Sequence, residues 1–264
     1  MTPFYFGTQN ALFGVHHPPL SGSSRQCGIV LCYPIGQEYL SVHRSFRQLS
    51  FGLARAGFHV LRFDYSGSGD SAGESDEGDV EQWLADISMA VEQVKGRGGL
   101  TRVALVGVRL GATLGALVGA ERRDLAGLVL WEPIVNGREY LQTLMTLHRD
   151  WLRAVFSKPK QDRTDGRRLE ILGFPLTDRL RRGIEAIDLL ALEGRAAAGV
   201  LIIESDGEGR YARLGEHLSS RNCRVEYRHI PGPRVWTRGE GMDKAVVPVP
   251  ILQSIVSWLT GVSS

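Results

Sequence analysis

A five-residue turn, G-V-R-L-G (107–111), has the clearest chemical meaning in this 264-residue sequence. It follows the apolar run RVALVGV (102–108) and precedes a run of small and apolar residues (110–123). A serine at the centre of a G-x-S-x-G turn between a strand and a helix is a nucleophile. The central residue here is Arg109, whose guanidinium stays protonated and has no useful lone pair. We therefore expect that no acyl-enzyme forms at this turn.

Arg109 has two alternative uses, and the sequence leaves both open. In the first, its charge, the backbone N–H of Leu110 and the positive end of the following helix converge on one anion, such as a carboxylate, an enolate-like oxyanion or a phosphate. In the second, Arg109 fills the site and pairs with a carboxylate of the chain. The candidates for that pairing are Glu38, Asp206 and Glu208.

The elements that would position this turn follow one another in a regular order. Apolar runs bounded by turn residues predict parallel strands at 28–34, 58–65, 102–108, 126–133, 199–205 and 224–230. These runs lack two-residue alternation, as expected for strands that are covered on both faces. Helical patterns occur at 45–57, 79–96, 110–123, 210–221 and 251–261. The alternation of strands and helices predicts an α/β fold with a doubly wound, mostly parallel sheet.

The opening residues have a different pattern. Two short apolar runs around T-Q-N, within residues 3–19, predict an antiparallel hairpin at the edge of the sheet. His16 and His17 precede two prolines, so we expect them to lie in a turn.

The alternation also stops between residues 134 and 197, where the chain becomes helical in pattern and basic. We therefore predict an α/β core formed by 1–133 and 198–264, with a helical cap (lid) inserted at 134–197. The basic side chains of this insertion could present charge to an anionic substrate, but interspersed acidic residues favour a solvated helical face. Residues 157–168 have the composition of a mobile exposed loop.

Composition, charge and the absence of certain motifs limit the classes of function and the compartment that we expect. Hydrophobic residues make up 43% of the chain and charged residues 23%, with a net charge of +2, which predicts no nucleic-acid binding. Cys27, Cys32 and Cys223 lie in apolar runs and predict buried thiols in a reducing compartment. Because the first residues also lack the features of a signal peptide, we expect a cytoplasmic protein. No motif predicts a metal or another cofactor.

One stretch of the sequence has features of a membrane helix. Residues 103–120 are nearly all apolar, and three glycines in them have the G-x-x-x-G spacing of a dimerising membrane helix. Arg109 would be costly in the middle of such a span, and Gly107 interrupts it. We therefore favour a buried strand, a turn and a helix whose glycines lie close to a sheet.

Six motifs together resemble those of α/β-hydrolases. They are YPIGQEY (33–39), FDYSGSGDSAGE (63–74), GVRLGATLG (107–115), WEPIVNGREYL (131–141), GFPLTDRLRRGIEAIDL (173–189) and IPGPRVW (230–236). Within that superfamily the chain resembles the exosortase-A-system-associated hydrolases, relatives of the serine aminopeptidases. The resemblance covers nearly the whole chain, and it implies an α/β-hydrolase fold.

Most of the active site that this resemblance implies is missing. Arg109 stands at the nucleophile position, and Val235 or Trp236 stands where the family has its histidine. Glu208 best matches the position of the acid, but one carboxylate does not make a Ser-His-Asp system. The oxyanion donors remain, and the resemblance assigns them to the backbone N–H groups of Leu110 and Ile35.

A few other residues are candidates for the site. His43 and His148 could each act as a replacement acid or base, although lone histidines more often lie at the surface or pack. Glu38 and Tyr39 lie next to the oxyanion loop and are comparable candidates. Trp236 could form the wall of an apolar pocket, with core packing as the commoner alternative.

Three hypotheses about function follow. The first is an enzyme that acts on a small acyl, peptide or natural-product substrate, which could be anionic. It would stabilise an oxyanion or a carboxylate without forming an acyl-enzyme, as an isomerase, epimerase or lyase does. The second is a binding or scaffold protein in which Arg109 is structural. The third is a hydrolase in which a directly activated water attacks. An exposed Arg109 in an open pocket favours the first or the third, whereas an Arg109 bound to internal carboxylates favours the second.

Overall fold

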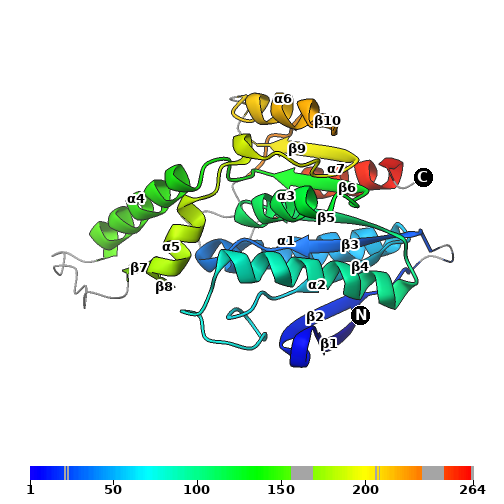
Figure 1. Ribbon diagram of the computed structural model, residues 1–264, viewed down its shortest axis with the longest axis horizontal. Helices are drawn as coiled ribbons and strands as arrows, with labels where there is room; N and C mark the ends of the chain where they lie inside the picture. The colour runs from blue at the N-terminus through cyan, green and yellow to red at the C-terminus, as the bar shows by residue number, and fades with distance from the viewer. Residues whose placement is uncertain are drawn as a thin grey trace.

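A long, mostly parallel sheet organises the molecule (Figure 1). The computed structural model describes residues 1–20, 22, 24–155, 169–205, 207, 209–233 and 247–262. In these residues eight strands form one sheet in the order β1-β2-β4-β3-β5-β6-β9-β10. Their bounds are β1 Thr2–Phe6, β2 Leu12–His17, β3 Cys27–Cys32, β4 His59–Phe63, β5 Arg102–Val108, β6 Gly127–Trp131, β9 Gly199–Glu204 and β10 Arg224–His229. Strands β4 to β10 of this order run parallel, and β2 joins β4 antiparallel.

Burial explains why the strand sequences lack alternation. Every residue of β3, β6 and β9 is buried, because helices cover both faces of the sheet there. Strand β10 is different: it lies at the sheet edge and none of its residues is fully buried. The strand predicted at 224–230 is therefore present, but the expectation that both of its faces are covered is wrong. Cys27, Cys32 and Cys223 are buried thiols, as predicted.

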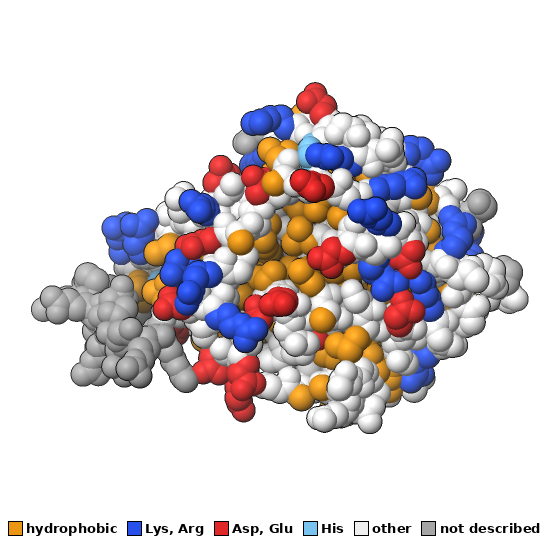
Figure 2. Space-filling view, viewed as in Figure 1, with side chains coloured by type: hydrophobic (Ala, Val, Ile, Leu, Met, Phe, Trp, Pro, Cys, Tyr) orange, Lys and Arg blue, Asp and Glu red, His pale blue; other side chains and the backbone are white. Residues whose placement is uncertain are grey.

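Helices cover the two faces of the sheet in two groups (Figure 1). The helices α2 (Val80–Gly98), α3 (Leu110–Arg122) and α6 (Ala212–Ser220) lie on one face. The helices α1 (Gly36–Arg55) and α7 (Val249–Val262) lie on the other. Figure 2 shows hydrophobic side chains gathered over α3 on the first face, with charged side chains around them. Nearly all of α3 is buried, as expected for a helix that follows a central strand.

Helix α1 corrects one prediction. The sequence predicts a helix over 45–57, but α1 begins at Gly36. Its buried stripe includes Val42, Phe46 and Leu49, at helical spacing, and the position one turn earlier is occupied by the buried Glu38. Because Glu38 is charged, the helical spacing of apolar residues does not extend to the first turns of α1 in the sequence. Those turns therefore have the composition of a loop.

The antiparallel hairpin predicted at the N-terminus is confirmed. Strands β1 and β2 pair antiparallel, with a short 3₁₀ turn, η1 (Thr8–Asn10), between them. The turn predicted for His16 and His17 is wrong, because both residues end β2 and pair with Leu61 and Val60 of β4. Both histidines are buried in this strand.

The segment between β6 and β9 is only partly helical. It contains α4 (Gly137–Val155), β7 (Leu169–Ile171), β8 (Phe174–Leu176), α5 (Asp178–Glu185) and the 3₁₀ turn η2 (Leu189–Ala191). The β7–β8 hairpin was not predicted, because its two strands have three residues each and carry no clear alternation. The loop predicted at 157–168 lies outside the described residues. Figure 1 shows α4 and α5 beyond one end of the sheet.

The apolar run at 103–120 divides as predicted into strand β5, a turn and helix α3. A side chain at Gly111 or Gly119 would collide with the carbonyl oxygens of Cys32 and Ala196, so these glycines let α3 lie close to neighbouring backbone. Among the described helices, none combines the length and the apolar character that a membrane crossing requires.

Candidate functional site

The turn between β5 and α3 has a strained backbone. Arg109 has a φ of 53° and a ψ of −127°, a conformation that costs a non-glycine residue about 1–3 kcal/mol. Its N–H donates to the carbonyl of Trp131 at 3.0 Å. A side chain at Gly107 would collide with the backbone of Ala112, and one at Gly111 with the carbonyl of Cys32. Both flanking glycines are therefore needed for a turn this tight, which presents the side chain of Arg109 at the end of the sheet.

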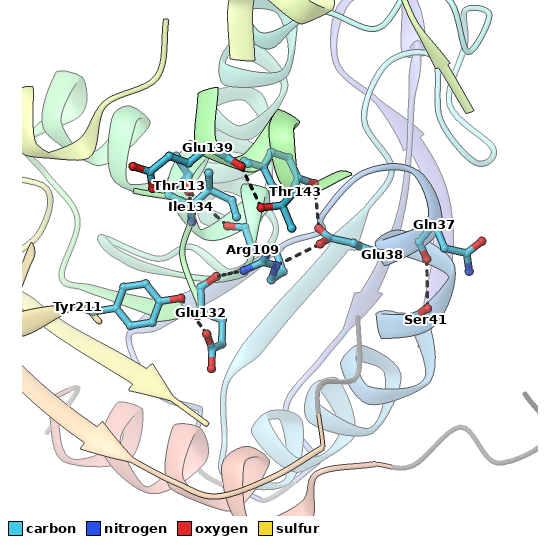
Figure 3. Close-up of polar contacts among 11 residues, drawn as sticks. Gln37, Glu38, Ser41, Arg109, Thr113, Glu132, Ile134, Glu139, Thr143 and Tyr211 are labelled. Atoms are coloured by element: carbon cyan, nitrogen blue, oxygen red, sulfur yellow. Dashed lines mark hydrogen bonds and ion pairs between the residues drawn. The ribbon is translucent and has the colours of Figure 1, made fainter. Parts of the chain in front are cut away.

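The guanidinium of Arg109 is held by groups from other elements (Figure 3). Its Nε donates to Oε1 of Glu38 at 3.1 Å, and its Nη1 donates to the carbonyl of Glu132 at 3.3 Å. It also lies over the ring of Tyr140, 5.7 Å from the ring centroid. The side chains of Arg109 and Glu38 are 13% and 7% exposed, so this is an almost fully buried ion pair.

Glu38 is the centre of the hydrogen bonding. It lies in the first turn of α1, and its Oε2 accepts a hydrogen bond from the hydroxyl of Tyr140 at 3.0 Å. Burial raises the pKa of Glu38, and the charge of Arg109 and the two hydrogen bonds oppose that rise. Burial acts to lower the pKa of Arg109, but Glu38 more than offsets it, so Arg109 stays protonated. Glu38 thus supplies an internal counter-ion for the guanidinium.

A second carboxylate supports the strand ends beside this pair. Glu132 has a φ of 48° and is 2% exposed. Its carboxylate accepts hydrogen bonds from the N–H of Ser205 at 2.7 Å and from the hydroxyl of Tyr211 at 2.8 Å. The hydroxyl of Thr113 bridges the N–H and carbonyl of Ile134, at 2.9 and 2.8 Å. These contacts fix the carbonyl of Glu132 that Arg109 binds.

Sequence reasoning did not single out Glu132, Tyr140 or Tyr211. Glu132 and Tyr140 belong to the motif WEPIVNGREYL (131–141), so the motif did mark this segment. The spacing of its residues does not show, however, which side chains elsewhere in the chain they contact. Trp131, in the same motif, is fully buried in the core.

The two expected oxyanion donors lie at helix starts. Leu110 is the first residue of α3, and Ile35 is the extended residue that precedes α1, with a φ of −111°. Within the described part of the chain, neither backbone N–H donates a hydrogen bond. Both groups are therefore available to an acceptor atom.

The structure brings together Arg109 and Glu38 but directs other candidates elsewhere. The hydroxyl of Tyr39 donates to Asp64 at 2.9 Å. His43 is exposed on α1, with its ring stacked 6.1 Å from that of Tyr33. Nδ1 of His148 accepts from the N–H of Leu172 in the β7–β8 hairpin, at 3.1 Å. The candidates Asp206, Glu208, Val235 and Trp236 lie outside the described residues.

Comparison with known proteins agrees with this architecture. The family model "Serine aminopeptidase, S33" matches residues 40–170, just under half of the chain. A highly thermostable carboxyl esterase from Bacillus coagulans is similar to the chain with a TM-score of 0.67 and 18% identity, covering 100% of this chain and 99% of the esterase. The chain has the α/β-hydrolase fold. No curated protein matches it.

Two other solved structures of this fold are similar over almost the whole chain. Est1E from Butyrivibrio proteoclasticus with bound ferulic acid has a TM-score of 0.64 and 15% identity, covering 95% of this chain and 94% of Est1E. A proline iminopeptidase from Mycobacterium smegmatis has a TM-score of 0.64 and 14% identity, with coverages of 96% and 95%. At these identities the similarity concerns the α/β-hydrolase fold, and it carries no substrate from one protein to another.

Proposed function

We propose that this chain uses the α/β-hydrolase fold to bind the carbonyl group of a small acyl or peptide ligand without forming an acyl-enzyme. Arg109 replaces the nucleophilic serine of active members, and residues 134–197 form a cap that contributes Tyr140. The observation that carries this proposal is the buried ion pair between Arg109 and Glu38, because it occupies the strained turn where this fold holds its nucleophile.

The ion pair also indicates the class of ligand. Glu38 neutralises Arg109, so a second anion would have to displace an internal carboxylate that Tyr140 also holds. A neutral carbonyl oxygen needs only the two backbone donors, and the N–H groups of Leu110 and Ile35 have no partner within the described residues. A neutral ester, amide or peptide carbonyl therefore fits this site better than a free carboxylate. Two of the similar structures are named as a carboxyl esterase and a proline iminopeptidase, and these names are consistent with a ligand of this class.

Labelling and turnover test the proposal directly. We expect no covalent adduct with a fluorophosphonate and no burst or turnover of p-nitrophenyl butyrate. We expect butyryl p-nitroanilide to bind without being cleaved, as measured by isothermal titration. Arg109→Ser should gain no esterase activity, because no histidine occupies 230–236. A phosphonylated serine in the wild type, or absence of any binding by the anilide, would overturn the proposal.

A second candidate is an isomerase, epimerase or lyase in which Glu38 moves a proton next to the same backbone donors. Glu38 lies within hydrogen-bond distance of Arg109 at this turn, and burial raises its pKa, which is the direction that suits an acid–base group. Its test is exchange of the α-proton of N-acetylphenylalanine amide in D₂O, followed by NMR. Exchange that is catalysed by the wild type and lost in Glu38→Gln supports this enzyme, and equal spectra with and without protein exclude it for this probe.

A further inference from the structure

A second buried arginine lies away from the Arg109 turn, and no described acidic side chain pairs with it. Arg62, on β4, is 8% exposed. Its Nε donates to Nε2 of His17 at 3.3 Å, and its Nη1 donates to the hydroxyl of Tyr33 at 3.2 Å. In the described part of the chain, Nη2 has no hydrogen-bond partner and no carboxylate lies within ion-pair distance of Arg62. Both partners of this guanidinium are therefore neutral groups.

Asp64, which follows the end of β4, is already engaged by other groups. Asp64, two residues further along the chain, accepts hydrogen bonds from the hydroxyl of Tyr39 at 2.9 Å and from the N–H of Asp70 at 3.1 Å. The groups that act on the pKa of Asp64 include His43 but not Arg62. A cation buried without a counter-ion is costly, and a ligand that brings a negative charge would remove that cost.

Helix α1 presents a row of side chains to this region. Tyr39, His43, Arg47 and Phe51 follow one another at intervals of four residues, so they lie on one face of the helix. The ring of Phe51 packs edge-on against His17, with centroids 5.2 Å apart, and His43 stacks on Tyr33 at 6.1 Å. Both contacts place this face beside the partners of Arg62.

Electrostatics agrees with that placement. Burial is the main cause that lowers the pKa of His17 to about 4, and the charges of Arg62 and Arg47 contribute to the same shift. Burial also lowers the pKa of His43; Arg62 and Arg47 act in the same direction, and the carboxylate of Asp64 opposes them. Arg62 and Arg47 therefore raise the potential over one small region. His43 and Arg47 are exposed, so that region opens to solvent.

We infer that Arg62, Arg47 and His43 form a binding site for a phosphate group, either free phosphate or the end of a small phosphorylated ligand. A phosphate group has enough acceptor oxygens to bind two guanidinium groups and an imidazole N–H at once, whereas a carboxylate has only two. The site lies between α1 and the sheet, and it uses none of the residues that surround Arg109.

Thermal melting in inorganic phosphate tests this site, with potassium chloride at equal ionic strength as the reference. We expect phosphate to raise the melting temperature of the wild type, with an increment that grows with concentration. Arg47→Ala should weaken the apparent affinity about tenfold, because it removes one charged hydrogen-bond donor. Arg44→Ala is the matched control, since Arg44 is also exposed on α1 and its loss changes the net charge equally. A wild type that melts alike in both salts, or equal responses of the two variants, would overturn the inference.

Two further arms make the test specific. Arg62→Met keeps most of the side-chain volume and should abolish the phosphate response; if it does not fold, His43→Ala replaces it and should weaken the response as Arg47→Ala does. Phenyl phosphate distinguishes the two sources of the group: tighter binding than inorganic phosphate indicates a phosphorylated ligand, and weaker binding indicates the free ion. If His43→Ala and Arg47→Ala both respond to phosphate as the wild type does, the site does not exist.

Discussion

Arg109 and Glu38 form a buried ion pair that joins the turn after β5 to the first turn of α1, with 3.1 Å between Nε and Oε1. The hydroxyl of Tyr140 on α4 completes the group by binding the second oxygen of Glu38. Three elements that are distant in the sequence thus meet around one carboxylate. Glu38 therefore balances the charge of the guanidinium inside the protein. This internal pairing favours a structural role for Arg109 over a role as an open receptor for an anion.

Removing one partner of this pair should be strongly destabilising. We expect Arg109→Ala to lower the free energy of unfolding by about 3–5 kcal/mol, because it leaves Glu38 buried without a counter-ion. The double variant Arg109→Ala/Glu38→Gln should regain part of the loss, since no charge then remains to be buried. Urea unfolding of Arg109→Ala, Glu38→Gln, the double variant and the control Arg44→Ala measures this. If the free energy of unfolding falls in the double variant by at least the sum of the falls in the two single variants, the pair does not act as an internal ion pair.

The close packing of the turn makes a second prediction. Gly111→Ala would place its methyl group against the carbonyl of Cys32, whereas the nearest atom to the same methyl at Gly115 is Cδ1 of Leu128, at 3.3 Å. We expect Gly111→Ala to cost about 3 kcal/mol or to prevent folding, because backbone cannot move aside as a side chain can. Gly115→Ala should stay folded, with a loss below about 1 kcal/mol. Circular dichroism and urea unfolding compare the two, and equal stabilities would show that α3 can shift away from β3.

The two histidines of β2 predict how stability depends on pH. Burial lowers the pKa of both His16 and His17 from 6.5 to about 4, so the folded protein keeps them neutral where the unfolded chain protonates them. The contribution of these histidines to the free energy of unfolding is fully present above pH 6.5. It is lost as the pH falls from 6.5 to 4, by about 2 kcal/mol for each histidine. We expect wild-type stability to fall over this range.

Urea unfolding at pH 7.5 and pH 5 measures this loss. His16→Gln should flatten the decline, because its neutral amide does not titrate. His16 also hydrogen-bonds His59 across a 3.1 Å contact, so the same variant should cost some stability at pH 7.5. A decline as steep in His16→Gln as in the wild type would mean that other groups govern it.

Local pattern predicted most of the fold but only part of the site. The strands and the glycine-flanked turn were predictable, because burial on both faces and close backbone approach each leave a mark in nearby residues. The partner of Arg109 was not, because Glu38 lies 71 residues away and competed with two other carboxylates. The start of α1 was missed for a related reason: Glu38 occupies a core-facing position that only its distant ion pair makes tolerable.

Tyr140 was missed because its role depends on a contact between α4 and α1, across 102 residues of sequence. No helical or strand period contains such information. The β7–β8 hairpin was missed because three-residue strands are too short for alternation to be distinguished from a turn. Prediction thus failed where tertiary contacts override local pattern, as they do for the pairing of Glu38 with Arg109 and of Tyr140 with Glu38.

Replacing Glu38 by alanine should open a carboxylate-sized space beside the guanidinium of Arg109, next to the atoms that Glu38 now binds. We expect Glu38→Ala to be less stable than the wild type and to regain stability in formate, which can accept the hydrogen bonds of Arg109 and Tyr140 in place of the lost side chain. The gain should grow with the logarithm of formate concentration once the site is half filled, as for any ligand that binds only the folded state. Thermal melting in sodium formate, against sodium chloride at equal ionic strength, measures it, with the wild type as the control whose site Glu38 already fills. If formate raises the melting temperature of the wild type as much as that of Glu38→Ala, its effect is general and does not come from filling a space that Glu38 occupies.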